Sequence, residues 1–181
     1  RPIKSLFEQS NMLTAAFPEI FWANPRKEAP VWSMDSGLVL KRESESNTCS
    51  LEAWGLVDGM PTGKHFDVRV YDDVITETSV YTPDQMKKAE DAFRMSDNLG
   101  TKNGRQRIVG TVYSHGDYYS RLREESELGI YPWHIRVKPW FDVARYEKEK
   151  IKYPVLLSTE KIKEKQRKQG SRIFAAQMEL D

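Results

Sequence analysis

A chain of 181 residues, 39% of them hydrophobic, is long enough for one domain with a full core, and its composition argues against disorder. The 28 Lys and Arg residues nearly balance the 27 Asp and Glu residues, so overall charge does not attract the chain to nucleic acid. No apolar run reaches the roughly 18 residues of a membrane span, and the single Cys49 excludes an intrachain disulfide, so we expect a cytoplasmic protein with no membrane partner.

The first third of the chain predicts a helix, a connection and a hairpin. Apolar side chains recur every three or four residues over 3–17, which predicts a helix that Pro18 ends. Residues 23–36 are rich in proline and charge and predict an exposed connection. The strand-like segments 37–42 and 49–56 predict a hairpin closed by a polar turn.

The middle of the chain predicts a strand followed by a capped helix. The glycine-containing loop 57–66 leads into "DVRVYDD", where Val68 and Val70 alternate with Arg69 and Tyr71 as in a strand. "TPDQ" (82–85) is a typical helix start, because Thr can cap, Pro suits the first helical position and Gln can close a capping box. We expect this helix to run toward Gly100.

The remaining elements continue the alternation of strands and helices. We predict a strand over 105–114, a helix over 117–128 that Asp117 caps, a strand over 132–140, and a charged helix over 158–169 between Ser158 and Gly170. Strands that alternate with helices from residue 66 to residue 138 are typical of crossover units on a parallel sheet. The predicted fold class is therefore α/β, with a mainly parallel sheet flanked by helices.

Two acidic residues end the first of these strands. Ligands of open parallel sheets bind outside the carboxyl ends of the strands, where Asp72-Asp73 and Gly110-Thr111 both lie. An apolar strand that ends in two acids is typical of a Walker B segment, in which one acid holds Mg²⁺ and the other polarises the attacking water. The alternative is that Asp72 and Asp73 only end a strand and begin a turn.

The glycine loop before this strand does not form a phosphate cradle. "GMPTGKH" (59–65) has one residue fewer than G-x-x-x-x-G-K-[ST], carries His65 in place of the hydroxyl, and precedes a strand rather than a helix. The phosphate-binding lysine of a Walker A loop is therefore missing from the chain.

Four motifs in order resemble the large terminase subunit of tailed bacteriophages, the ATP-driven motor that packages DNA into capsids. The first lies in "LEAWGLVDGMPTGKHFDVRVYDDVI", which carries Ala53, Gly55, Gly63 and Lys64 ahead of the two acids. The others lie in "RIVGTVYSHGDYYSRL" and in "GSRIFAAQMELD", and carry Gly110, Thr111, Asp117, Gly170, Phe174 and Gln177. The segment "RIVGTVYSHGDYYSRL" is similar to the coupling motif of that family.

The resemblance implies a role for each site residue. Asp72 would coordinate Mg²⁺ and Asp73 would activate water, although many relatives carry Glu at the second position. Thr111 would be the coupling residue that senses the γ-phosphate of ATP, against the alternative of an ordinary β-branched strand residue. Lys64 would reach the nucleotide of a neighbouring subunit, where relatives often carry arginine; the alternative is an exposed loop lysine.

The resemblance also implies an architecture and partners. Residues 1–150 would be a partial ATPase core with a P-loop NTPase-like sheet that lacks its Walker A portion, and 151–181 a helical linker toward a nuclease domain. The chain would be part of a longer motor subunit and inactive alone. ATP and Mg²⁺ are the expected cofactors, and the expected partners are double-stranded DNA, a small terminase subunit, a portal protein and further copies in a ring.

Other residues carry weaker signals. His115 and Asp117 lack a third metal ligand at a recognisable spacing, and Asp117 is better read as a helix cap. Trp133 and Trp140 suggest core packing over stacking on DNA. The alternating charges of 158–169 are typical of a solvated helix face, and Cys49 lacks an activating partner. Two rival classes stay open: another P-loop nucleic-acid motor such as a helicase, and a non-enzymatic α/β binding or scaffold domain.

Overall fold

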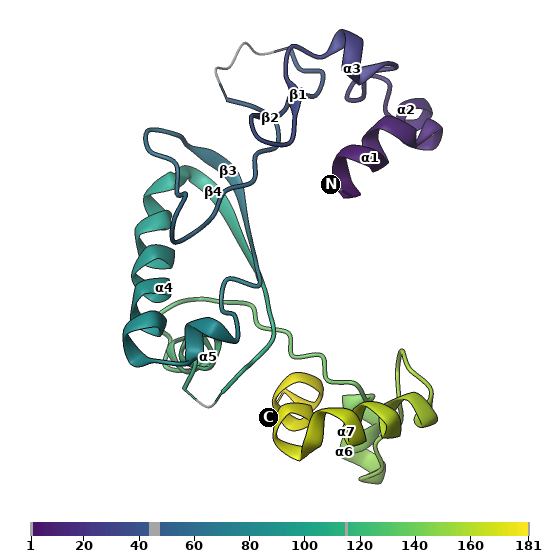
Figure 1. The fold of residues 1–181 in the computed structure, drawn as a ribbon, viewed down its shortest axis with the longest axis vertical. Helices are drawn as coiled ribbons and strands as arrows, with labels where there is room; N and C mark the ends of the chain where they lie inside the picture. Colours follow the sequence, from purple (N-terminus) through teal and green to yellow (C-terminus); the bar gives the residue numbers. More distant parts are fainter. Residues whose placement is uncertain (1, 44–47, 115, 181) are drawn as a thin grey trace. The chain divides into compact units, whose positions relative to one another are not determined.

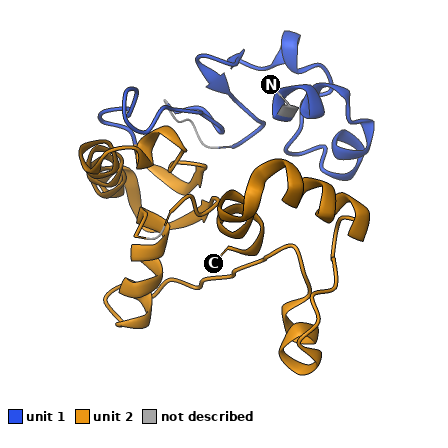
Figure 2. Cartoon of the chain, turned by 60° about the horizontal axis from the view of Figure 1, so that its bottom comes forward, with its two compact units in different colours: residues 1–64 blue, residues 65–181 orange. Residues whose placement is uncertain are grey.

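The computed structural model describes residues 2–43, 48–114 and 116–180. Contacts divide the chain into two compact units, residues 1–64 and residues 65–181 (Figure 2). The predicted boundary at residue 150, which separates an ATPase core from a linker, stays a prediction. Every helix among the described residues is too short or too polar to cross a membrane.

The first unit begins with two short helices where the sequence predicts one. The helices α1 (Pro2–Gln9) and α2 (Asn11–Ala16) are separated by Ser10, whose backbone is extended. The Ser10 side chain accepts a hydrogen bond from the backbone N–H of Leu13 at 3.3 Å. A serine offers this alternative to helical bonding in mid-helix, so the apolar period continues while the helix restarts.

The predicted connection over 23–36 is wrong in part, because it contains regular structure. It holds α3 (Pro25–Glu28) and β1 (Trp32–Ser33), and β1 pairs antiparallel with β2 (Gly37–Leu38). The predicted hairpin between 37–42 and 49–56 is reduced to one antiparallel bridge between Leu38 and Leu51. Part of its turn, residues 44–47, lies outside the described residues.

Glu8 holds the elements of the first unit together. Its carboxylate pairs with Arg26 of α3 at 2.8 Å and accepts a hydrogen bond from the indole of Trp32 at 2.9 Å. The guanidinium of Arg26 is the main reason that the pKa of the Glu8 carboxyl falls to about 2. One carboxylate on α1 therefore fixes both α3 and β1.

The second unit contains two parallel strands where the sequence predicts them, but the second begins and ends five residues earlier than the predicted range 105–114. Strand β3 (Phe66–Asp72) pairs in parallel with β4 (Gly100–Val109), and α4 (Pro83–Met95) forms the crossover between them (Figure 1). The helix cap at Thr82 is confirmed, since its hydroxyl accepts from the Gln85 N–H at 3.2 Å. The protein is thus mixed α/β with a small parallel sheet flanked by helices. Two short 3-10 helices flank α4: η1 (Thr78–Val80) precedes it and η2 (Ser96–Leu99) follows it. Gly100 then begins β4.

An aromatic core fixes the helices on one face of this sheet. The ring of Tyr71 on β3 lies 4.7 Å from Phe93 of α4, and Phe93 lies 5.2 Å from Tyr118 of α5 (Tyr118–Glu127), measured between centroids. The predicted cap of α5 is confirmed, because Asp117 accepts from the Ser120 N–H at 3.0 Å. The same face partly buries Arg69, whose guanidinium donates to Ser96 O at 2.6 Å and to Asp97 at 3.0 Å.

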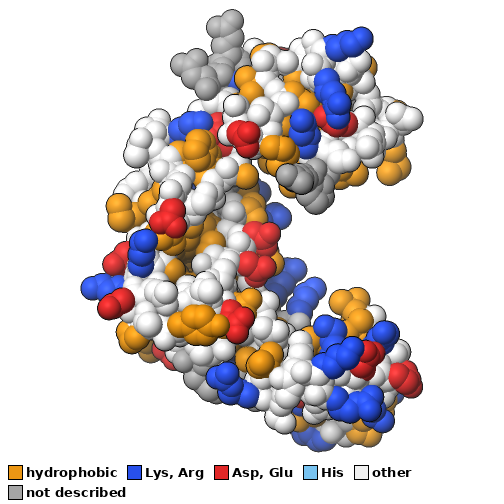
Figure 3. All heavy atoms as spheres, in the orientation of Figure 1, with side chains coloured by type: hydrophobic (Ala, Val, Ile, Leu, Met, Phe, Trp, Pro, Cys, Tyr) orange, Lys and Arg blue, Asp and Glu red, His pale blue; other side chains and the backbone are white. Residues whose placement is uncertain are grey.

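The opposite face of the sheet is uncovered. Val68 and Val70 of β3 are 56% and 62% exposed, and Val109 of β4 is 58% exposed. Figure 3 shows hydrophobic, basic and acidic side chains next to one another on the side of β3 and β4 opposite α4. The alternation predicted for this strand is real, but its buried side carries arginine and tyrosine rather than the valines.

The predicted strand over 132–140 is wrong. Residues 132–139 are outside regular secondary structure, although their apolar and charged residues alternate as in a strand. Pro132 and Pro139 have no N–H to donate to a sheet, which limits pairing at both ends of this segment. Trp133 stacks on Tyr131 at 6.2 Å between ring centroids.

The C-terminal helices pack around a second aromatic group. They are α6 (Val143–Glu149), α7 (Thr159–Phe174) and the π-helix η3 (Ala175–Glu179). Ser158 caps α7 as predicted, and Gly170 has a non-helical backbone with φ +73° where the sequence predicts the end. Phe174 is buried against Trp140, and Glu164 pairs with Lys168 at 2.7 Å on an exposed helix face.

Replacing Phe93 with alanine tests the aromatic core. Phe93 is only 7% exposed and joins α4 to both β3 and α5, so Phe93→Ala should lower the free energy of unfolding by about 3–5 kcal/mol. Urea denaturation followed by circular dichroism measures this value. Leu128→Ala removes a side chain that is 75% exposed and should change it by less than about 0.5 kcal/mol. Equal effects of the two substitutions would contradict this core.

Tyr118 makes stability depend on alkaline pH. Burial raises the pKa of its phenol from 10.0 to about 12. Between these values the unfolded chain loses the proton first, so the free energy of unfolding should fall by about 2–3 kcal/mol as the pH rises, and the stabilisation is complete below pH 10. Thermal denaturation across this range should show a flatter profile for Tyr118→Phe. Tyr81→Phe, at a position that is 65% exposed, should leave the profile of the parent protein unchanged.

Candidate functional site

The acid pair lies where the parallel strand β3 ends. Asp72 is the last residue of the strand and Asp73 follows it; both side chains are exposed. Asp73 has a left-handed backbone with φ +46°, a conformation that aspartate tolerates better than most residues. Its N–H donates to Val109 O at 3.0 Å, so the turn is anchored to the end of β4.

The second predicted pair lies at the end of the neighbouring strand. The register places Asp72 opposite Val109, directly before Gly110 and Thr111. Thr111 is half-buried. The structure therefore brings Asp72, Asp73 and Thr111 to the same edge of the sheet, as parallel pairing requires.

Tyr119 of α5 joins the two strand ends and was missed by reasoning from sequence. Its ring packs so closely on Gly110 that a Cβ atom there would overlap the ring. Its hydroxyl accepts a hydrogen bond from the Ile75 N–H at 3.3 Å, just beyond the acid pair. Burial is the main cause of the raised pKa of the Tyr119 phenol, and the negative charge of Asp73 contributes. A glycine at a strand end, followed nine positions later by an aromatic residue, is too weak a signal to reveal this contact.

Asp117 organises the loop between Thr111 and α5. The carboxylate is fully buried, and one oxygen accepts from the Tyr113 N–H at 2.9 Å while the other accepts from the Ser120 N–H and hydroxyl at 3.0 and 3.1 Å. Through these bonds, Asp117 holds the loop after Gly110-Thr111 against the first turn of α5, which is why an aspartate follows Gly110 at this distance. His115 lies outside the described residues, so a metal site shared by His115 and Asp117 is not described.

The edge of the sheet offers two carboxylates rather than a complete metal cage. Within residues 2–43, 48–114 and 116–180, no group of three or more His, Cys, Asp or Glu side chains could hold a metal ion. Mg²⁺ commonly binds one or two carboxylates and completes its shell with water and substrate phosphates. Two exposed aspartates at the end of a strand fit that mode of binding, and do not fit a site built from protein ligands alone.

Lys64 belongs to the first unit and already has a partner. Its ammonium group lies 2.6 Å from the Glu52 carboxylate and 4.8 Å from the centroid of the Trp54 ring. Burial raises the pKa of the Glu52 carboxyl. Hydrogen bonds from Lys64, Cys49 N–H and Trp54 lower it by more, so the pKa lies below its usual value. Lys64 is therefore half-buried in an ion pair, which the exposed-loop alternative did not predict.

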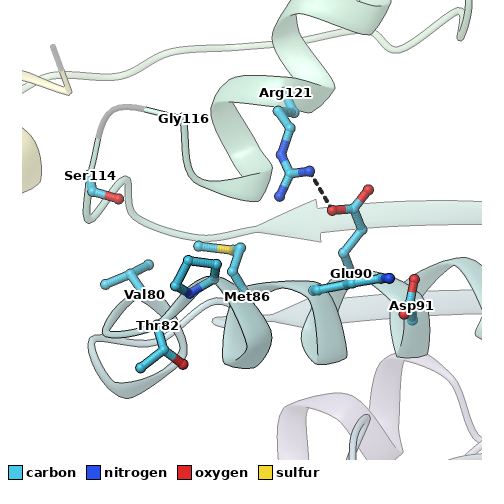
Figure 4. Close-up of a pocket in the computed structure, with 10 residues that line it drawn as sticks. Val80, Thr82, Met86, Glu90, Asp91, Ser114, Gly116 and Arg121 are labelled. Carbon is cyan, nitrogen blue, oxygen red and sulfur yellow. Dashed lines mark ion pairs between the residues drawn. The ribbon is translucent and has the colours of Figure 1, made fainter.

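Cys49 and a pocket of the second unit carry no assigned chemistry. Burial, with a contribution from Glu52, raises the pKa of the Cys49 thiol, which lowers the fraction of reactive thiolate. The pocket has a volume of about 550 Å³ and lies between α4, α5 and the loop before α5 (Figure 4). Its Glu90 and Arg121 pair with each other at 2.6 Å. Asp72, Asp73 and Thr111 are not among its lining residues.

Comparison with known proteins leaves the chain without an assigned relative: no protein-family model matches it, and no curated protein matches it.

Replacing Gly110 with alanine tests the link between the strand ends. The added methyl group must displace the Tyr119 ring and break its hydrogen bond with Ile75, so the free energy of unfolding should fall by about 1–3 kcal/mol. Urea denaturation measures the loss. Gly55→Ala is the matched control, since its Cβ would meet only Gly59 backbone atoms at 3.6 Å, an ordinary contact. A Gly110 variant as stable as this control would show that Tyr119 does not need the close approach.

Proposed function

We propose that this chain is part of the ATP-hydrolysing motor subunit of a bacteriophage DNA-packaging terminase, and that it contributes the Walker B acids and the coupling motif. The supporting observation is the shared edge of the sheet, where two adjacent parallel strands end at Asp72 and Val109 and lead directly into Asp73 and into Gly110-Thr111. The proposal includes a P-loop NTPase-like sheet whose Walker A strand and loop lie on further sequence of the protein.

The two carboxylates have different positions and therefore different proposed roles. Bound Mg²⁺ would neutralise phosphate charge as the terminal phosphate leaves ATP. Asp72, at the last position of β3, would hold this ion through its exposed carboxylate. Asp73, one residue further along in the left-handed turn, orients the attacking water. The anchoring of Asp73 N–H to Val109 O limits the movement of this second carboxylate.

Thr111 and Tyr119 would connect the proposed nucleotide site to helix α5. A hydroxyl at position 111 would sense whether the terminal phosphate is present, and a shift of this segment would move Gly110 against the Tyr119 ring, which packs on it. Because Tyr119 lies in the first turn of α5, the shift passes to that helix. This contact supports the assignment of Thr111 as the coupling residue.

The partners follow from the resemblance and extend the proposal. Double-stranded DNA would be the translocated substrate, and a small terminase subunit, a portal protein and further copies in a ring would complete the motor. Lys64 serves a neighbouring subunit's nucleotide only if it exchanges the Glu52 carboxylate for phosphate oxygens. A non-enzymatic α/β scaffold domain is the second candidate, favoured by the left-handed backbone of Asp73, which aspartate often adopts in simple turns.

Isosteric substitution of the acid pair tests the proposal. DNA-stimulated ATP hydrolysis by the longer protein should fall by about 10²-fold or more in both Asp72→Asn and Asp73→Asn, because each removes a charge from the reacting centre without changing the side-chain shape. Asp91→Asn, at an exposed position on α4, is the matched control and should retain the parent rate. Unchanged turnover in both acid-pair variants would reject the motor and leave the scaffold domain.

A further inference from the structure

The uncovered face of the β3–β4 sheet has the composition of a binding surface. We call it the outer face and define it by side chains that alternate with the buried ones on both strands. In register order these are Val68 with Arg105, Val70 with Arg107, and Asp72 with Val109. All six are exposed, and the aromatic core lies on the other side of the strands.

Valines in a parallel sheet are ordinarily covered. Parallel sheets occur almost only with helices on both faces, yet the three valines of the outer face are 56–62% exposed. An exposed apolar surface that polar groups surround is typical of a protein interaction site. The outer face therefore lacks the layer that a sheet of this kind normally has.

The charge of the outer face indicates the chemistry of that layer. Arg105 and Arg107 form no ion pair among the described residues, whereas Arg69, on the buried side of the neighbouring strand, pairs with Asp97. Guanidinium groups pair best with carboxylates, to which they can donate two parallel hydrogen bonds. The missing layer should therefore present carboxylates to β4 and aliphatic side chains to the valines.

We propose that the outer face binds an acidic amphipathic helix of a partner protein. Residues two positions apart on a strand are separated by about 6.6 Å, and residues four positions apart on a helix rise by about 6 Å. Two glutamates at that helical spacing reach Arg105 and Arg107 together when the helix lies along β4. Aliphatic residues beside them cover Val68 and Val70. This proposal does not rest on ATP hydrolysis, and its test does not measure it.

Nucleic acid fits the outer face less well. Contacts with phosphates need positive charge but no apolar surface, and here valines alternate with the charged residues. The observations therefore favour a protein helix.

A designed peptide tests this proposal on residues 1–181. The probe is a fluorescent alanine-based helix with a stripe of leucines and glutamates spaced four residues apart, and its counterpart carries lysines instead. Anisotropy should show that the glutamate peptide binds the parent protein. Arg105→Glu/Arg107→Glu should weaken this binding at least about tenfold, because two attractive contacts become repulsive, and should bind the lysine peptide instead.

Matched variants keep the result interpretable. Lys87→Glu/Lys163→Glu makes the same change in net charge at exposed positions on α4 and α7, outside the outer face, and should bind the glutamate peptide as the parent does. If charge reversal disrupts the circular dichroism spectrum, Arg105→Gln/Arg107→Gln replaces it, with the same expected loss. Equal binding of the two peptides by the parent protein would overturn the proposal.

Two further outcomes would assign the surface to other occupants. A dimer in sedimentation velocity that Val70→Asp abolishes would show that a second copy covers the outer face. Binding of a DNA duplex that is lost only in the arginine variants would show a nucleic-acid surface. Either result would overturn the helix proposal, whereas a monomer without arginine-dependent DNA binding supports it.

Discussion

The parallel pairing of β3 with β4 is the constraint on which the second unit depends. Parallel strands cannot be joined by a tight turn and need a crossover of a dozen or more residues, which α4 supplies here. The rings of Tyr71, Phe93 and Tyr118 hold that crossover and α5 against one face. The position of the strand ends and the exposure of the outer face both follow from this arrangement.

The shared direction of the strands explains why the candidate site is compact although its residues are far apart in sequence. Both carboxyl ends lie at the same edge, so the segments that hold Asp72 and Thr111 come together across 38 intervening residues. Tyr119 then ties the two ends together through Gly110 and Ile75. Two adjacent carboxylates are tolerable here because both are exposed to water, which screens their repulsion.

The two faces of the sheet show how local hydrogen bonds can decide burial. Arg69 and Tyr71 lie on the covered face because the end of α4 offers partners for both. The Ser96 carbonyl and the Asp97 carboxylate accept from the guanidinium, and the Ser96 hydroxyl lies 2.7 Å from the tyrosine hydroxyl. These bonds offset the cost of burying polar groups. Valine has no polar group that needs a partner, and the valines lie on the exposed outer face.

The sequence by itself determined the local structure: the period of β3, the helix starts at Thr82, Asp117 and Ser158, and the break at Gly170. These depend on contacts within a few residues. The sequence-based prediction of a strand over 132–140 was wrong, because a strand needs a partner strand as well as strand propensity. Only the tertiary structure decided which side of β3 is buried, the close approach of Tyr119 to Gly110 and the pairing of Lys64 with Glu52. Each of these depends on contacts between segments that the chain brings together only on folding.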